Sequence, residues 1–174
     1  MIQSFLSFTP QIHPQAYIHP SAVIIGQVTL AAHSSIWPQV TLRGDDGRID
    51  IGQHSNIQDN SVCHLTSEWS NTIIGDYVTV GHGVILHGCI IHHHCLIGMG
   101  SIILDNAEIG EYCLIGAGTL ITAQKKIPPR SVVLGNPGIV VRSVSEREIN
   151  MIEAGWQTYT QRAIDYQQSK IIST

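Results

Sequence analysis

IHHHCLIGMGSIILDNAEIGEYCLIGAGTLI, residues 91–121, has an isoleucine at every sixth position. An amphipathic helix repeats its apolar residues every 3.6 positions and a half-buried strand every second position, so a strict period of six fits neither. A short fixed period over many residues is typical of a solenoid, in which each repeat is a short strand plus a tight turn. We therefore expect these isoleucines to line one shared core.

The period of six continues on both sides of this stretch. Aliphatic residues, or a cysteine, keep it in four runs, 12–42, 51–63, 74–86 and 91–139, which together make twenty-one hexads. A small residue often stands four places after the aliphatic one, and a glycine often follows it directly. These hexads predict an all-β solenoid domain over residues 1–142.

The pattern resembles the hexapeptide-repeat proteins, whose fold is a left-handed parallel β-helix of triangular cross-section with three hexads per coil. The resemblance covers about residues 12–142. It implies about seven coils and a left-handed path, whereas the general rule for parallel crossovers would favour a right-handed one.

Three breaks interrupt the repeat, and two of them border histidines. The first, between residues 42 and 51, contains Gly44-Asp45-Asp46-Gly47, which predicts a turn. The second, between residues 63 and 74, predicts a loop around 65–71 that bulges outward. The third, between residues 86 and 91, is one residue short of a hexad. Loops on a rigid scaffold often carry function, so these breaks mark the region to inspect.

Beyond residue 142 the period of six ends, and residues 143–174 form a second part of the chain. Ser145 and Glu148 make the pattern of a capping box, and apolar residues follow at spacings of three and four. We predict one amphipathic helix over about 146–168, packed on a flank of the solenoid or across to a neighbouring subunit. The tail, 169–174, should be frayed.

Composition excludes several classes of partner. A net charge of −4 with only nine Lys and Arg residues argues against nucleic acid. The apolar runs are too short for a membrane span, and the N-terminus lacks the pattern of a signal peptide, so we expect a soluble, cytoplasmic protein. The four cysteines form no C-x-x-C pair and should be reduced and buried, with a disulfide or a zinc knuckle as the alternative.

Three histidines, His64, His82 and His87, stand within 24 positions of the chain. If every third hexad shares a face, Arg43, His64 and His87 directly follow the first residues of the sixth, ninth and twelfth hexads and should stack, about 4.8 Å apart per coil. Asp59 and His82 are the third residues of the eighth and eleventh hexads and should stack on the preceding face.

This arrangement predicts a metal site that one chain cannot complete. His82 lies around a corner from His64 and His87, too far for metal–nitrogen bonds of about 2.0–2.1 Å. We therefore predict a homotrimer with three metal sites at its subunit interfaces, in which Arg43 also approaches Asp59 of the neighbouring subunit. Arg43 in a solvated ion pair is the alternative.

Three neutral imidazoles with no fourth protein ligand describe an open site that leaves room for water. Such ligands favour Zn²⁺, with Fe²⁺ or Co²⁺ as alternatives, and water on zinc ionises near pH 7. The chemistry expected is hydration or hydrolysis by metal-bound hydroxide. The alternative is that all three are ordinary surface histidines.

The motifs Arg43-Gly44-Asp45, Asn56-Ile57-Gln58-Asp59, Cys63-His64, Gly81-His82 and Leu86-His87-Gly88 resemble those of the γ-class carbonic anhydrases. The resemblance implies reversible hydration of CO₂ to bicarbonate, with His64, His82 and His87 as metal ligands. It implies that Gln58 positions water or bicarbonate, and that Arg43, Asp45 and Asp59 organise the interface and the site.

The chain departs from this family in the groups that would transfer protons. Active members carry glutamates near the site, one of them on a loop after the first ligand. Here that loop offers only Glu68, and Asp46 is a second acid near the turn after Arg43. Glu68 as an idle surface residue, with buffer removing the proton, is the alternative.

Two other functions fit the same fold. A hexapeptide acyltransferase or a coenzyme A thioester hydrolase would use one histidine as general base, and Gly135-Asn136-Pro137-Gly138 resembles a loop of such transferases. A non-catalytic, metal-stabilised trimeric scaffold is the third hypothesis. We interpret the run 92–94 and four other histidines as turn residues, although the run could also capture a metal. The four are His13, His19, His33 and His54.

Overall fold

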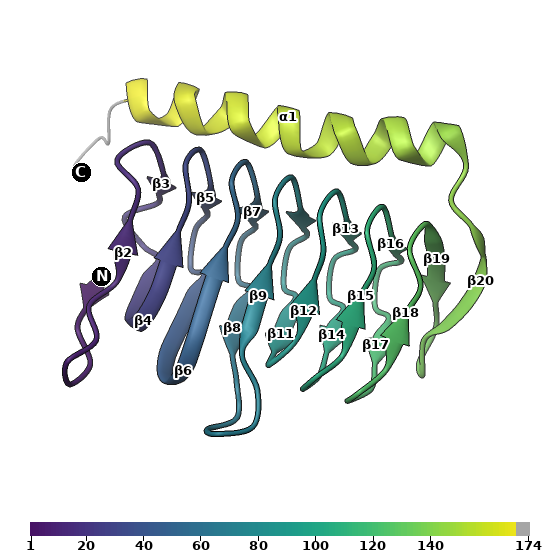
Figure 1. The fold of residues 1–174 in the computed structure, drawn as a ribbon. Coiled ribbons are helices and arrows are strands. Elements are labelled where there is room, and N and C mark those ends of the chain that lie inside the picture. The colour runs from purple at the N-terminus through teal and green to yellow at the C-terminus, as the bar shows by residue number, and fades with distance from the viewer. Residues whose placement is uncertain (170–174) are drawn as a thin grey trace.

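The computed structural model describes residues 1–169 and contains a left-handed parallel β-helix of about seven coils and one C-terminal helix (Figure 1). The predicted solenoid is thereby confirmed. From β1 to β19, consecutive strands lie on different sides of a triangular prism, and each strand pairs in parallel with a strand one coil away.

The prism has three faces, and short parallel strands stack along each of them. Face 1 holds β8 (Val62–His64), β11 (Ile85–His87), β14 (Ile102–Ile103) and β17 (Leu120–Ile121). Face 2 holds β2 (Gln11–Ile12), β9 (Thr72–Ile74), β12 (Ile90–Ile91), β15 (Glu108–Ile109) and β18 (Lys126–Ile127). Face 3 holds β3 (Tyr17–Ile18), β5 (Ser35–Ile36), β7 (Asn56–Ile57), β10 (Thr79–Val80), β13 (Leu96–Ile97), β16 (Leu114–Ile115) and β19 (Ser131–Leu134).

Three further strands complete the N-terminal coils. β1 (Ile2–Gln3) pairs with β4 (Val23–Leu30), and β4 pairs with β6 (Thr41–Ile51). Because β4 and β6 stay paired around the corner of the prism, they join faces 1 and 2 into one sheet.

The core is built from the residues that carry the period of six. Ile97, Ile103 and Ile109 are fully buried, as are small residues between them such as Ser101 and Ala107. Burying one aliphatic side chain contributes about 1.5–3 kcal/mol, and the parallel ladders satisfy the backbone polar groups around it. The four cysteines are free and buried, as expected, and burial raises the pKa of the Cys63 thiol to about 12.

Two details of the predicted repeat are wrong. The segment Gly44–Gly47 is not a separate turn but part of β6, because the backbone of this corner pairs with β4 as far as Gly26 and resumes at Val28. β6 carries extra residues between those two points, and they bulge from the ladder. The loop after His64 bulges as expected, but Leu65 is buried and belongs to the core.

The last hexad is also wrong. Ile139, the expected start of a further inward strand, is 60% exposed and lies in β20 (Ile139–Ser143). β20 pairs antiparallel with β19 and so ends the solenoid instead of extending it. Ile139 keeps the period of six, but no further coil follows in which its side chain could be buried.

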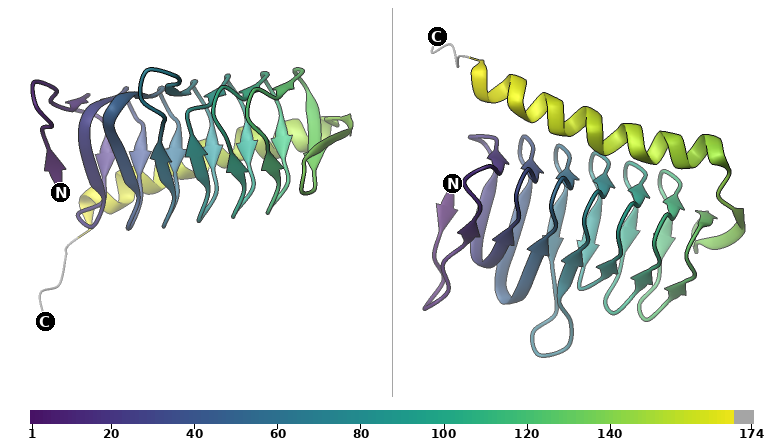
Figure 2. Two further views of the ribbon diagram at one scale, coloured as in Figure 1. Left: turned by 90° about the horizontal axis from the view of Figure 1, so that it is seen from below. Right: turned by 45° about the horizontal axis from the view of Figure 1, so that its top comes forward.

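The predicted helix is α1 (Glu146–Gln168), and its capping box is present: the Ser145 side chain accepts from the Glu148 N–H. α1 runs back along face 3 from the last coil toward the first (Figure 2). Ile152 and Ala163 are buried against this face. Among residues 1–169, no helix is long and apolar enough to cross a membrane. The tail expected to be frayed lies, beyond Ser169, outside the described residues.

A column of rings follows the corner between faces 2 and 3, beneath α1. Its residues occupy the left-handed region at successive coils, with φ between 54° and 59°. Neighbouring ring centroids are 4.6–5.4 Å apart, and Trp156 of α1 packs on two of the rings. The column contains His33, His54, Tyr77, His94 and Tyr112.

The docking of α1 on this column should weaken in acid because of His54. Burial lowers the pKa of His54 and His33 lowers it further, while Asp76 opposes them. The unfolded chain therefore binds this proton more readily, so the contribution to stability is complete above pH 6.5 and is lost as the pH falls below it. Thermal melts from pH 7.5 to 5 should show a larger decrease in Tm for the wild type than for His54→Asn, since asparagine tolerates positive φ. Parallel pH profiles would contradict this.

Candidate metal centre

His64 and His87 lie side by side at the ends of β8 and β11, where face 1 meets face 2. They are direct partners in the parallel ladder, so the predicted stacking is confirmed. Nδ1 of His64 is 3.2 Å from Nε2 of His87, and the rings meet at an interplanar angle of 60°.

The spacing of these two nitrogens fits a shared metal ion. Two ligands bound at about 2.0–2.1 Å in a tetrahedral arrangement stand about 3.3 Å apart. The 3.2 Å separation is close to this value, and it is also the distance of a hydrogen bond between the two rings.

The outer nitrogen of His64 is held by acids from the bulged corner of β6. Nε2 of His64 is 3.2 Å from Oδ1 of Asp45 and 3.4 Å from Oδ2 of Asp46. Arg43 donates to the other oxygen of Asp45 at 2.6 Å. Partial burial raises the pKa of Asp45, but hydrogen bonds from Arg43, its own backbone and His64 outweigh it, so the pKa is below its ordinary value.

The outer nitrogen of His87 is held by Asp105, a residue that the sequence analysis missed. Nδ1 of His87 is 3.0 Å from Oδ2 of Asp105, and the Ser70 hydroxyl donates to Oδ1 at 2.6 Å. Asp105 follows His87 by 18 residues, one position more than the 17-residue coil that pairs Leu86 with Ile103. Searching about one coil ahead of each histidine for an acid would have found it.

His82 occupies a different corner, between faces 3 and 1. Its Nδ1 is 2.9 Å from Oδ2 of Asp59, and the Gly83 N–H donates to the Asp59 carbonyl, so the predicted stacking of His82 over Asp59 is confirmed. Gln58 is buried next to this pair and donates to the Asn56 side chain at 3.1 Å. A hollow of about 330 Å³ beside His82 is also lined by residues of α1, among them Tyr159 and Arg162.

The candidate centre therefore consists of two separate halves in one chain. The two-histidine half contains His64, His87 and their acids, and the one-histidine half contains His82, Asp59 and Gln58. The width of face 1 lies between them, because His82 precedes β11 at one corner and His87 is its last residue at the other. Within the chain, Arg43 pairs with Asp45 and not with Asp59. Glu68 is exposed in the loop after His64, whereas Asp46 contacts His64 directly.

The three histidines of the run 92–94 do not point toward one common position. His92 pairs with Glu108 at 3.0 Å, His93 with Asp76 at 3.5 Å, and His94 with Glu153 of α1 at 2.6 Å. Because each ring pairs with a different acid, the three histidines do not form one metal site. They lie in the bend between β12 and β13, in agreement with their interpretation as turn residues.

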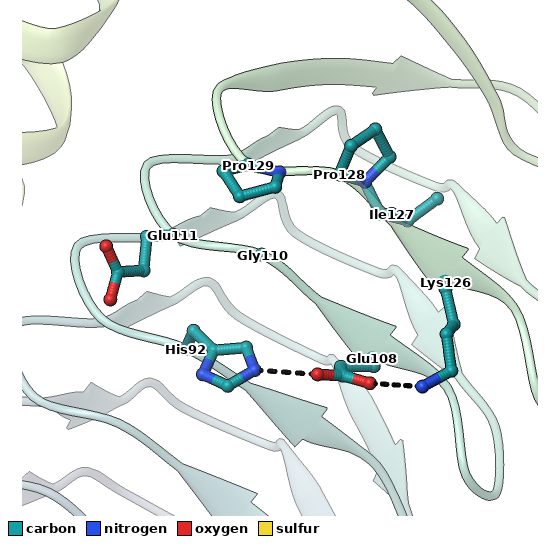
Figure 3. Close-up of a pocket in the computed structure, with 8 residues that line it drawn as sticks. All are labelled: His92, Glu108, Gly110, Glu111, Lys126, Ile127, Pro128 and Pro129. Carbon is teal, nitrogen blue, oxygen red and sulfur yellow. Dashed lines mark hydrogen bonds and ion pairs between the residues drawn. The ribbon is translucent and has the colours of Figure 1, made fainter.

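A separate groove of about 500 Å³ lies on face 2, away from both halves (Figure 3). In it, Glu108 bridges His92 and Lys126, with the Lys126 ammonium 2.7 Å from the carboxylate. Gly110, Ile127, Pro128 and Pro129 form the apolar wall.

Comparisons with known proteins agree with this fold. The family model described as bacterial transferase hexapeptide (six repeats) matches residues 88–123. The chain is 52% identical to a probable carbonic anhydrase of Methanocaldococcus jannaschii over 136 residues. This alignment covers 78% of this chain and 85% of that protein. It is 40% identical over 147 residues to the carnitine operon protein CaiE of Escherichia coli K12, covering 84% of this chain and 74% of CaiE.

Two solved structures are similar over nearly the whole chain. A Bacillus cereus protein described as a "putative acetyltransferase" superimposes with a TM-score of 0.94 at 40% identity, covering 96% of both chains. A hexapeptide transferase family protein from Anaplasma phagocytophilum gives a TM-score of 0.91 at 34% identity, covering 95% of this chain and 97% of that one.

Proposed function

Because this chain belongs to the family of hexapeptide-repeat proteins related to the γ-class carbonic anhydrases, we propose that it catalyses the metal-dependent, reversible hydration of CO₂ to bicarbonate. One observation carries the proposal: each of the three histidines has one ring nitrogen held by an acid. The other nitrogen of each ring has no acid as its partner and is available to a metal, although those of His64 and His87 contact each other at 3.2 Å. This carboxylate–histidine pairing is typical of metal ligands.

His64, His82 and His87 are the proposed ligands, with Zn²⁺ as the expected ion and Fe²⁺ or Co²⁺ as alternatives. Such an ion, when bound, supplies Lewis-acid activation of a water molecule at neutral pH. Asp45 and Asp59 keep the imidazole rings oriented, and Arg43 holds Asp45 in position through the 2.6 Å ion pair.

The proposed site is completed by a second copy of the chain. His82 stands at the opposite corner of face 1 from His64 and His87, so we expect a neighbouring subunit to supply it. An apolar stripe along the outside of face 1, between the two halves, supports a homotrimer with this face turned to its axis. The stripe consists of Val62, Ile85, Ile102 and Leu120, stacked coil on coil.

Gln58 and two acids have proposed roles around the reacting molecules. Gln58 uses its amide N–H on Asn56, so its carbonyl oxygen can accept a hydrogen bond from water or bicarbonate. Asp46 is the better placed of the two candidate proton carriers, because it is exposed and contacts His64. Glu68 is a second carrier only if its loop bends toward the site.

Stopped-flow CO₂ hydration on protein of measured metal content tests the proposal. The Zn²⁺ form and the anaerobic Fe²⁺ form should both be assayed, with about one ion per chain expected. Turnover that rises with metal content is the supporting result. An intact trimer that binds no metal would sink the proposal, whereas one that binds metal without turnover would be a scaffold.

Acyl transfer or thioester hydrolysis is the second candidate, and the groove on face 2 favours it. Its apolar wall beside the His92–Glu108 pair could receive an acyl chain next to a general base. Thermal stabilisation by acetyl-coenzyme A, without any effect of bicarbonate, would favour this function over CO₂ hydration.

A further inference from the structure

Asp105 is the least exposed of the three acids that pair with histidines of the candidate metal centre through a hydrogen bond, and its second oxygen is bonded to a loop outside the repeat. Its side chain is 12% exposed, compared with 20% for Asp45 and 35% for Asp59. Oδ2 lies against Nδ1 of His87, and Oδ1 accepts from Ser70. One carboxylate therefore joins a candidate metal ligand to the loop that follows His64.

One further hydrogen bond closes this loop, residues 66–71, on itself, and another ties it to the coil of Asp105. The Ser70 hydroxyl accepts from the Thr66 N–H at 3.1 Å, and the Asn106 side chain donates to the Trp69 carbonyl at 3.3 Å. Gly88 has a φ of 64°, and a Cβ there would lie 2.1 Å from Ser70 Oγ and 2.3 Å from Asp105 Oδ1. The close approach of Asp105, Ser70 and the backbone after His87 thus requires glycine.

The contact with Asp105 decides which nitrogen of His87 carries the hydrogen, because Oδ2 lies 3.0 Å from Nδ1 and Oδ1 already accepts from Ser70. An ionised carboxylate can only accept, so the hydrogen of neutral His87 must reside on Nδ1. The lone pair of Nε2 then points toward His64, the direction in which the metal is expected.

We propose that Asp105 is a positioning residue that holds His87 in the Nδ1–H form and couples the 66–71 loop to this metal ligand. The effect on metal binding rests on the proposed function, whereas the His87 tautomer follows from the contacts of Asp105 alone. An outer acid of this kind typically changes metal affinity by about 10–100-fold.

The first test is the tautomer of His87 in the metal-free protein, measured by ¹⁵N NMR of the imidazole. Wild-type protein should show the Nδ1–H form. Asp105→Asn should shift His87 toward the Nε2–H form, because the amide can donate to Nδ1, and should weaken Zn²⁺ binding by about 10–100-fold. The Co²⁺ absorption spectrum should change as well.

Asn106→Gly is the matched control, since it frees the Trp69 carbonyl and keeps the positive φ of 57° without touching Asp105. It should speed hydrogen exchange in the 66–71 loop while the tautomer and the Zn²⁺ affinity stay as in the wild type. Asp105→Asn should change the hydrogen exchange of the loop, the tautomer of His87 and the Zn²⁺ affinity.

Two results would overturn the inference: a wild-type His87 in the Nε2–H form, or an Asp105→Asn variant that keeps both tautomer and affinity. The first needs no variant, so it holds even if the substitution prevents folding. If the wild-type tautomer is as expected but no metal binds, the proposed function fails while the positioning role stands.

Discussion

Replacement of His87 by alanine is expected to remove metal binding and CO₂ hydration together. The change deletes one of the two imidazoles whose nitrogens lie 3.2 Å apart and leaves the Asp105 carboxylate without its partner. Changes in the outer acids of metal sites already cost about 10–100-fold in affinity, so losing a ligand should cost more than about 100-fold. Metal analysis after dialysis and stopped-flow hydration measure the two effects.

His92→Ala is the control for that experiment. His92 also pairs with a carboxylate in its own chain, but it lies at another corner, beside the groove on face 2. Its removal should leave metal content and hydration unchanged. If His87→Ala keeps its metal, or if His92→Ala loses it, the assignment of the two-histidine half is wrong.

Ile85→Glu is expected to give a monomer that has lost its metal as well as its activity. Ile85 is 41% exposed in the isolated chain and lies in the apolar stripe of face 1, two residues before His87. Burying a carboxylate at an apolar interface without a partner costs on the order of several kcal/mol. Light scattering would report the mass, and metal analysis of the same fractions would report the ion.

Ile90→Glu serves as the control because Ile90 is similarly exposed, at 38%, but points outward from face 2. This variant should stay trimeric and keep its metal. A monomeric Ile85→Glu protein that still binds one ion per chain would show that a single chain can close the site. The proposed division of the ligands between subunits would then be wrong.

Local signals were sufficient for most of the fold. The period of six predicts where the chain turns, because each hexad must place an aliphatic residue in the same narrow core. The capping box at Ser145 and Glu148 starts α1 at the expected residue, since both groups act within one turn of helix. The stacking of His64 with His87, and of Asp59 with His82, follows from counting coils.

Other features depend on contacts between coils. The Gly44–Gly47 segment resembles a turn in sequence, yet β4 keeps part of this corner in a ladder and the rest bulges toward His64. Ile139 keeps the period of six, but β20 reverses direction because no further coil follows. Neither outcome can be deduced from the spacing of aliphatic residues.

The sequence by itself determined the solenoid, the helix and the corner on which each histidine stands, because a strict repeat converts residue number directly into position. Only the tertiary structure decided which acids face His64 and His87. Asp105 meets His87 across a coil boundary, and its second oxygen reaches Ser70 in a loop outside the repeat. Such contacts depend on side-chain direction and on how far a loop folds back, and neither is encoded in the period.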